Sequence, residues 1–164
     1  MHCFKAILYC FNSKPQTPCP TPEGVVFDIM VHMFTLEEID KIHERFGNAE
    51  TLAQYLQALW AIGVLRQDSF ITDGHSEYYG QDGYTVSSPT IHGAFPVANA
   101  SNQKELLQHL DLHGQHKTSY LEMVKGLADS GVEKWTFDTN AMTITYYDRA
   151  GNIMKAESVE SKTT

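Results

Sequence analysis

The sequence predicts an α+β fold in which helices pack on one face of an antiparallel sheet. Three observations predict it: two helical patterns are followed by two or three strand patterns, this order occurs twice, and the second occurrence lies 68 residues after the first. Each unit alone is too small to bury a sufficient core. We therefore expect the two tandem units to form one domain with four helices and about six short strands.

The repeat consists of identical residues at an offset of 68 positions. The residues that recur are apolar, glycine or tyrosine: Leu59, Gly63, Val64, Tyr78, Tyr79 and Gly83 correspond to Leu127, Gly131, Val132, Tyr146, Tyr147 and Gly151. No gap is needed between Gly63 and Gly83, which favours a duplication. Helix–glycine–strand patterns also recur for structural reasons alone, and this second interpretation stays open.

The first unit begins with two predicted helices. Thr35 and Glu38 have the spacing of a capping box, and Asn48 is the candidate cap of the second helix. We expect Gly63 in the left-handed conformation that ends a helix. Apolar residues recur at three-to-four spacing along both helices: Leu36, Ile39, Ile42 and Phe46, then Leu52, Tyr55, Leu56 and Leu59.

Strand patterns over residues 65–72, 75–79 and 84–87 complete the first unit. Asp73-Gly74 between the first two strands predicts a hairpin. Phe70 is out of phase with Phe137 of the second unit, so we expect a bulge or a different turn at this point.

The second unit repeats the order. Ser101 or Asn102 is the candidate cap of its first helix, whose apolar face is Leu106, Leu107 and Leu110, and Ser119 with Glu122 forms a capping box before the second. Gly131 ends that helix, and strands are expected around residues 135–137, 142–147 and 153–158. Six residues are expected to be buried together in the shared core: Leu56, Leu59, Val124, Leu127, Trp135 and Phe137.

The chain is predicted to have one folded domain, residues 33–164, with units of about 35–88 and 101–158, preceded by an extension over 1–32. The extension contains all three cysteines and has no net charge. Because a capping box follows Met33 directly, we expect translation to begin at Met33. The alternative is a disordered arm with a short strand at residues 25–31.

Composition excludes some classes of function. The chain has 12 Lys and Arg against 20 Asp and Glu, a formal charge of −8, which disfavours nucleic-acid binding. No apolar stretch approaches 18 residues, so no membrane span is expected. The lack of cysteine after Cys19 favours a reducing compartment, the cytoplasm. No Gly-rich phosphate loop is present and no cofactor is expected. The oligomeric state does not follow from the sequence.

Two groups of polar residues are candidate sites. His109 and His113 lie four residues apart, a spacing that zinc can use, but they have no His-Glu-x-x-His context. Solvated histidines near a helix end are the favoured interpretation.

The second group, Asp73, His75, Glu77 and Tyr78, surrounds the first hairpin. The second unit has Ala141, Thr143 and Thr145 in place of Asp73, His75 and Glu77. His75 beside a carboxylate can act as an acid/base pair, although an exposed hairpin is the commoner explanation of such a group. Because this hairpin departs from its own repeat partner, we expect any ligand-binding site there.

Three segments carry a resemblance to a known family: 72–78 (Thr-Asp-Gly-His-Ser-Glu-Tyr), 129–135 (Asp-Ser-Gly-Val-Glu-Lys-Trp) and 142–148 (Met-Thr-Ile-Thr-Tyr-Tyr-Asp). They resemble the YbcV-like proteins, a bacterial family of unknown function whose members are often labelled "phage envelope protein". The resemblance covers about residues 33–158. It implies a compact cytoplasmic domain, bacterial or prophage-borne, and carries over no catalytic residue.

Three functions follow as hypotheses. The absence of a complete catalytic signature favours a non-catalytic binding or accessory module, whose partner is a small molecule or a protein that contacts the sheet rim or the groove between the units. The alternative is a small enzyme that uses His75 with Asp73 or Glu77. The third, a phage structural component, depends on the family label alone.

Overall fold

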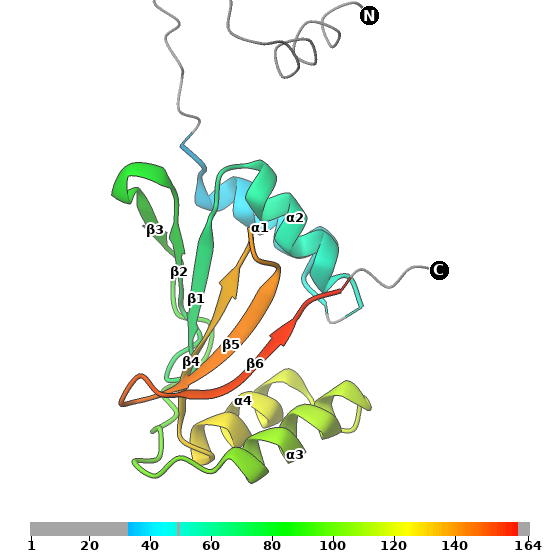
Figure 1. Ribbon diagram of the computed structural model, residues 1–164, viewed down its shortest axis with the longest axis vertical. Coiled ribbons are helices and arrows are strands. Elements are labelled where there is room, and N and C mark those ends of the chain that lie inside the picture. The colour runs from blue at the N-terminus through cyan, green and yellow to red at the C-terminus, as the bar shows by residue number, and fades with distance from the viewer. Residues whose placement is uncertain (1–32, 49, 161–164) are drawn as a thin grey trace, which may run out of the picture. The chain divides into compact units, whose positions relative to one another are not determined.

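The computed structural model describes residues 33–48 and 50–160 and confirms the α+β fold. The predicted extension, residues 1–32, lies outside the described residues. Two helices precede three strands in each half (Figure 1). The first half contains α1 (Leu36–Phe46), α2 (Leu52–Ala61), β1 (Arg66–Phe70), β2 (Ser76–Tyr79), the short 3-10 helix η1 (Gln81–Gly83) and β3 (Thr85–Ser87). The second contains α3 (Gln103–Gly114), α4 (Tyr120–Asp129), β4 (Val132–Asp138), β5 (Thr143–Asp148) and β6 (Ile153–Ser158).

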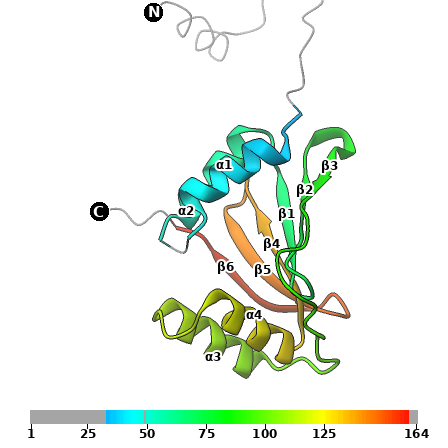
Figure 2. The same cartoon turned by 180° about the vertical axis from the view of Figure 1, so that it is seen from behind.

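All six strands form one antiparallel sheet in the order β3-β2-β1-β4-β5-β6, so the two halves join where β1 pairs with β4. Figures 1 and 2 show the pair α1/α2 beside one part of the sheet and the pair α3/α4 beside another. Side chains alternate along each strand, and those of one set enter the core under both helix pairs. We call the opposite side of the sheet the open face.

The register of β1 with β4 reveals a pseudo-twofold axis. Arg66 pairs with Asp138 and Phe70 with Lys134, and an offset of 68 residues converts the first pair into the second. Asp68 pairs with Thr136, which is its own counterpart at this offset. The axis therefore passes through the Asp68–Thr136 pair, as it does in an isologous contact between two subunits.

Secondary structure follows the same offset. When 68 is added to the residue numbers, α2 coincides with α4 residue for residue, and the last residue of α1 coincides with the last residue of α3. Left-handed backbone recurs too: φ is +95° at Gly63 and +84° at Gly131, and +75° at Gly74 and +53° at Met142. The prediction of equivalent left-handed glycines after equivalent helices is confirmed.

Helix caps were predicted well, with one correction. Both capping boxes are present, at Thr35 and at Ser119, and Asn102 caps α3 by accepting from the backbone N–H of Glu105. Asn48 is not the cap of α2: its side chain accepts from the backbone N–H groups of Glu50 and Thr51, and the helix begins after Thr51. The asparagine therefore stabilises the turn between α1 and α2 instead.

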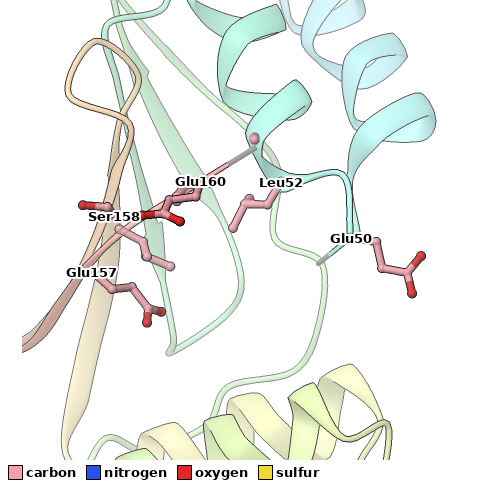
Figure 3. A pocket seen from close by; sticks show the side chains of 8 residues that line it. Glu50, Leu52, Glu157, Ser158 and Glu160 are labelled. Atoms are coloured by element: carbon pink, nitrogen blue, oxygen red, sulfur yellow. The ribbon is translucent and has the colours of Figure 1, made fainter. Parts of the chain in front are cut away.

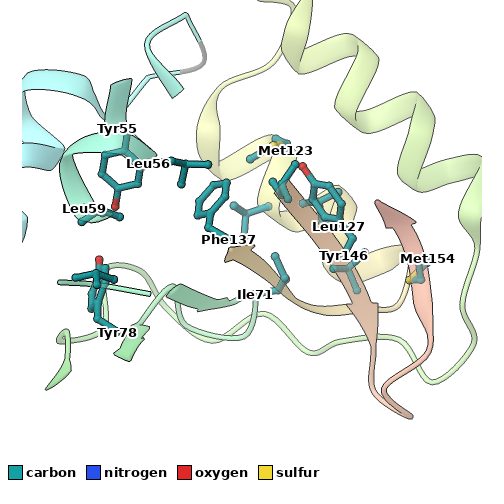
Figure 4. Close-up of a cluster of buried hydrophobic side chains, with 14 of the residues drawn as sticks. Tyr55, Leu56, Leu59, Ile71, Tyr78, Met123, Leu127, Phe137, Tyr146 and Met154 are labelled. Atoms are coloured by element: carbon teal, nitrogen blue, oxygen red, sulfur yellow. The ribbon is translucent and has the colours of Figure 1, made fainter. Parts of the chain in front are cut away.

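The core lies between the helices and the inner side of the sheet. Figure 4 shows Phe137 between side chains of α2 and α4. Five of the six expected core residues are buried, and Trp135 is partly buried against them. Leu107 differs from the expected helical face because it is 44% exposed, whereas Leu106 is fully buried.

The inner side of β1 and β2 is polar, unlike that of β4 and β5. Gln67, Ser69 and Ser76 are buried and have Trp135, Phe137 and Ile144 as their counterparts. The Tyr55 hydroxyl donates to Gln67, whose amide donates to Ser69 at 3.0 Å, and Ser69 lies 2.8 Å from Ser76. Because these groups satisfy one another, the polar side chains are tolerated inside the core.

Phe70 corrects the expectation of a bulge in its vicinity. It stays in register with β4 and lies on the open face, so its offset from Phe137 reflects the opposite side of the sheet and no bulge. The irregularities of the second half lie between Val132 and Lys134, and between Tyr146 and Tyr147.

Leu59→Ala should lower the free energy of unfolding by about 2–5 kcal/mol, because Leu59 is fully buried and the substitution leaves a cavity. Leu127→Ala, at the matching position of α4, should have a similar effect. Leu107→Ala is the matched control, since its side chain is largely exposed. Urea unfolding measures all three; equal midpoints for Leu59→Ala and Leu107→Ala would contradict this description of the core.

Candidate functional site

A buried carboxylate lies at the centre of the open face. Asp68 is 2% exposed, although its side chain points away from the helices. Its carboxylate accepts from Lys134 Nζ at 2.6 Å and from Thr136 Oγ1 at 2.8 Å, and Arg66 Nε lies 3.4 Å away. A carboxylate removed from water needs such partners, so three groups from β1 and β4 converge on it.

Aromatic rings flank the two cations that cover Asp68. The Arg66 guanidinium lies over the Tyr79 ring, 3.9 Å from its centroid. Lys134 Nζ lies 5.6 Å from the Phe70 centroid and 5.8 Å from that of Tyr147. Each cation is therefore held by the carboxylate below and by an aromatic ring beside it.

Asp68, its two cations and the rings of Phe70 and Tyr147 line a pocket of about 380 Å³, here called the central pocket. Its lining residues all come from strands and turns: Arg66, Asp68, Phe70, Glu133, Lys134, Thr136, Tyr147, Asp148, Arg149 and Gly151. Arg149 on the rim donates to Asn99 at 2.9 Å, and its Nε lies 3.8 Å from Glu133.

Asp148 directs its charge into the turn before β6. Its carboxylate accepts from the Asn152 side chain at 3.0 Å, from Ser101 at 2.7 Å and from the backbone N–H of Ala150 at 2.9 Å. These hydrogen bonds, that of the Asn152 side chain first, lower the pKa of Asp148 from 3.8 to about 2. The turn thus holds a carboxylate that stays ionised at neutral pH and is stabilised by hydrogen bonds within the turn and from Ser101.

The charged groups that line the pocket balance, with Arg66, Lys134 and Arg149 against Asp68, Glu133 and Asp148, but they differ in exposure. Arg66 and Arg149 have side chains 49% and 55% exposed, whereas the Asp68 and Asp148 residues are 2% and 9% exposed. The buried carboxylates fix the cations, and the cations face the solvent. This arrangement suits an anionic ligand with an apolar body that contacts the rings.

The predicted hairpin residues are only partly brought together. Asp73 Oδ1 lies 2.5 Å from His75 Nδ1, and this hydrogen bond lowers the pKa of Asp73. The His75 ring stacks on Phe70 with centroids 4.5 Å apart, which connects the pair to the edge of the central pocket. Glu77 accepts from the Tyr79 hydroxyl and pairs across the sheet with Asp68.

Tyr78 lies on the other side of the sheet from this group. It is 5% exposed, belongs to the core cluster and has its pKa raised by burial. Tyr146 is its buried counterpart in the second half, while Tyr79 and Tyr147 face the open side. The structure therefore separates Tyr78 from the three other predicted residues.

The helix histidines make local contacts. The His109 ring lies against Gly126 of α4 so closely that a Cβ there would be 2.4 Å from its Nδ1. His113 Nδ1 lies 3.1 Å from the Thr118 carbonyl oxygen. Within residues 33–48 and 50–160, no three His, Cys, Asp or Glu side chains are grouped to hold a metal ion.

Sequence reasoning missed the centre of the pocket. Asp68, Lys134 and Thr136 were not singled out, because Asp68 and Thr136 lie in no recognisable motif and the segment 129–135, which contains Lys134, carries a resemblance that assigns no role to it. One signal was present: Asp68 and Thr136 are counterparts at the repeat offset, and a strand that pairs with its own repeat copy brings two counterparts face to face. Aspartate is also uncommon in the middle of a strand, so Asp68 was a second signal of a polar site on the sheet.

The fold and the site define a class of protein: an α+β domain of two like halves with an open sheet face that carries a polar pocket. The chain belongs to the DUF1398 family, described as a protein of unknown function, whose model matches residues 40–158. No curated protein matches the chain. No helix formed by the described residues has the length and apolar character needed to cross a membrane.

Lys134→Met should lower the free energy of unfolding by about 3 kcal/mol, because it leaves the Asp68 carboxylate buried without its closest cation. In an Asp68→Asn background the same change should cost much less, since no buried charge then needs a partner. Lys125→Met is the control, because Lys125 and Asp129 form a solvent-exposed pair. Additive effects of the two substitutions in urea unfolding would contradict the coupling.

Asp148→Asn should destabilise the fold at pH 6 and progressively less toward pH 2. A carboxyl whose pKa is lowered in the folded state stabilises that state above its ordinary pKa, here 3.8, and loses this effect as the pH falls toward 2. Urea midpoints of both proteins at pH 6, 4, 3 and 2 measure the difference. A difference that stays constant over this range would count against the hydrogen bonds described here.

Proposed function

We propose that the protein is a non-catalytic binding module whose central pocket holds a small organic anion with an aromatic or apolar body. The observation that carries the proposal is Asp68, a buried carboxylate that fixes Lys134 and Arg66 beneath an open pocket. Cations held in advance by a carboxylate and by rings need little reorganisation to receive a ligand.

Size and composition support the same function. A pocket of about 380 Å³ is in the range of small-molecule sites. Phe70 and Tyr147 supply aromatic surface, and Arg66, Lys134 and Arg149 supply donors for a carboxylate or a phosphate. No histidine or cysteine is among the described residues that line the pocket, and the carboxylate to which the Thr136 hydroxyl donates is also occupied by Lys134, which favours binding over catalysis.

Binding of phenyl phosphate and benzoate to the full chain should shift the backbone amide resonances of Arg66, Phe70, Lys134 and Gly151, because the anion contacts the cations and the ring contacts the aromatic side chains. Benzyl alcohol, which has the ring but no charge, should bind at least about tenfold more weakly. Two-dimensional NMR titration measures both.

Matched variants make this experiment specific. Arg66→Gln and Arg149→Gln should each weaken phenyl phosphate binding, whereas Arg45→Gln on α1 should not. Equal binding of the neutral and the charged ring, or shifts confined to another surface, would exclude the proposed site.

A second candidate is an enzyme that uses His75. Asp73 lies 2.5 Å from one ring nitrogen of His75, as the carboxylate of an acid/base pair does. Such a role requires a substrate at the edge of the central pocket, next to Phe70. Turnover of small phosphate and carboxylate esters that His75→Ala abolishes, and that Arg45→Gln retains, would favour the enzyme over the binding module.

The assignment to YbcV-like proteins and the phage structural role both stay predictions. The assignment rests on the sequences of segments 72–78, 129–135 and 142–148, and the phage role rests on the label given to members of that family. The placement of residues 1–32 outside the fold, the start at Met33 and a cytoplasmic location stay predictions as well.

A further inference from the structure

A second hollow lies on the helix side of the protein, between the start of α2 and the end of β6. It encloses about 170 Å³, and we call it the α2–β6 groove. Its apolar floor consists of Leu52, Ala53, Ile144 and Val159. Figure 3 shows the Leu52 side chain between those of Glu50 and Glu157.

The pseudo-twofold axis relates this groove to an equivalent position in the other half, where side chains of the protein itself cover the surface. That place lies between the start of α4 and the segment after β3, where the His92 ring approaches the ring of Tyr120 at 6.4 Å and stacks on Phe95 at 4.8 Å. His92 Nε2 and Thr118 Oγ1 are both buried there. Two aromatic side chains of the connecting segment thus cover the second site.

The chain leaves the sheet in a similar way in both halves. After β3, the Ile91 N–H donates to the Asp73 carbonyl oxygen at 3.1 Å; after β6, the N–H of its counterpart Val159 donates to the Met142 carbonyl oxygen at 2.7 Å, one position beyond the counterpart of Asp73. The two sites differ further in their side chains.

Smaller or acidic residues replace the covering side chains in the groove. At the repeat offset, Leu52 is the counterpart of Tyr120, Ala53 of Leu121, and Glu160 of His92. Each of the first two replacements removes side-chain volume, and the third removes a ring. Among the residues that the structure describes, no aromatic group of the groove fills the space that His92 and Tyr120 occupy in the other half.

The rim of the groove is acidic. Glu50, Glu157 and Glu160 surround the apolar floor. Among the described residues, Lys155 is the one cation paired with this rim, through Glu157. Three carboxylates around an apolar hollow repel acidic partners and attract basic ones, so the rim selects the charge of whatever enters.

We propose that the α2–β6 groove is a docking site for a basic segment of a partner protein, which inserts one aromatic side chain flanked by lysine or arginine. The inserted ring takes the place that His92 and Phe95 hold in the other half, and the flanking cations contact the glutamates. This site is separate from the central pocket, since the two share no lining residue. Failure of either proposal therefore leaves the other intact.

The test uses the full chain and the peptide acetyl-Lys-Phe-Lys-amide. In methyl-resolved NMR spectra, the peptide should shift Leu52, Ile144 and Val159, and the shifts should weaken as salt is added. Acetyl-Glu-Phe-Glu-amide has the same ring with reversed charge and should produce no shift at these residues.

A triple variant separates charge from fold. Glu50→Gln, Glu157→Gln and Glu160→Gln together should weaken peptide binding about tenfold, as expected for the loss of three exposed ion pairs. The control variant carries Asp40→Asn, Glu44→Gln and Glu105→Gln, which change the net charge equally on exposed positions of α1 and α3, and should bind almost as the parent chain does.

Three results would overturn the proposal. The first is equal binding of the two peptides, or equal weakening by the two triple variants. The second is a set of shifts outside the groove. The third is a shift of the same methyl groups on concentrating the chain without peptide, because the groove would then hold a second copy of the chain.

Discussion

The antiparallel pairing of β1 with β4 is the contact on which the rest of the structure depends. It joins two three-stranded halves into one sheet and places both helix pairs over the same core. It also sets Asp68 opposite Thr136 and brings Arg66 and Lys134, themselves repeat counterparts, to either side of that pair. A shift of the register by one residue would turn these side chains to the other face and dissolve the charge cluster.

The two sides of the sheet differ in how their polar groups are buried. On the inner side, apolar side chains from α2 and α4 meet Phe137, and the buried polar groups of β1 and β2 satisfy one another together with Tyr55. On the open side none of the described helices removes water, so the Asp68 carboxylate is buried under neighbouring side chains of the sheet. The cations that bury Asp68 are then the groups nearest to the solvent. Stability and the proposed ligand binding thus depend on the same contacts at this site.

Much of the fold was predictable, because its signals are local or periodic. Capping boxes, left-handed glycines and the offset of 68 residues each act over a few residues or repeat regularly, and the structure confirms them. The centre of the pocket was not predictable in this way. Lys134 and Asp68 are far apart in the sequence and meet only through the β1–β4 register. The position of Phe70 was hard to predict for a related reason. An apolar side chain suggests the inner face of the sheet, whereas the β1–β4 register places Phe70 on the open face.

The position of Asp68 on the pseudo-twofold axis has a consequence for how such a site can arise. In a dimer of two identical half-chains, a residue on the axis faces its own copy, so an aspartate there would face an aspartate, and two carboxylates directly opposite each other repel. A chain that contains both halves is free of this restriction and can place threonine opposite aspartate. An aspartate opposite a threonine at the centre of this sheet is therefore possible only in a chain that contains both halves. Symmetric assembly of two copies of one half would place two aspartates or two threonines there.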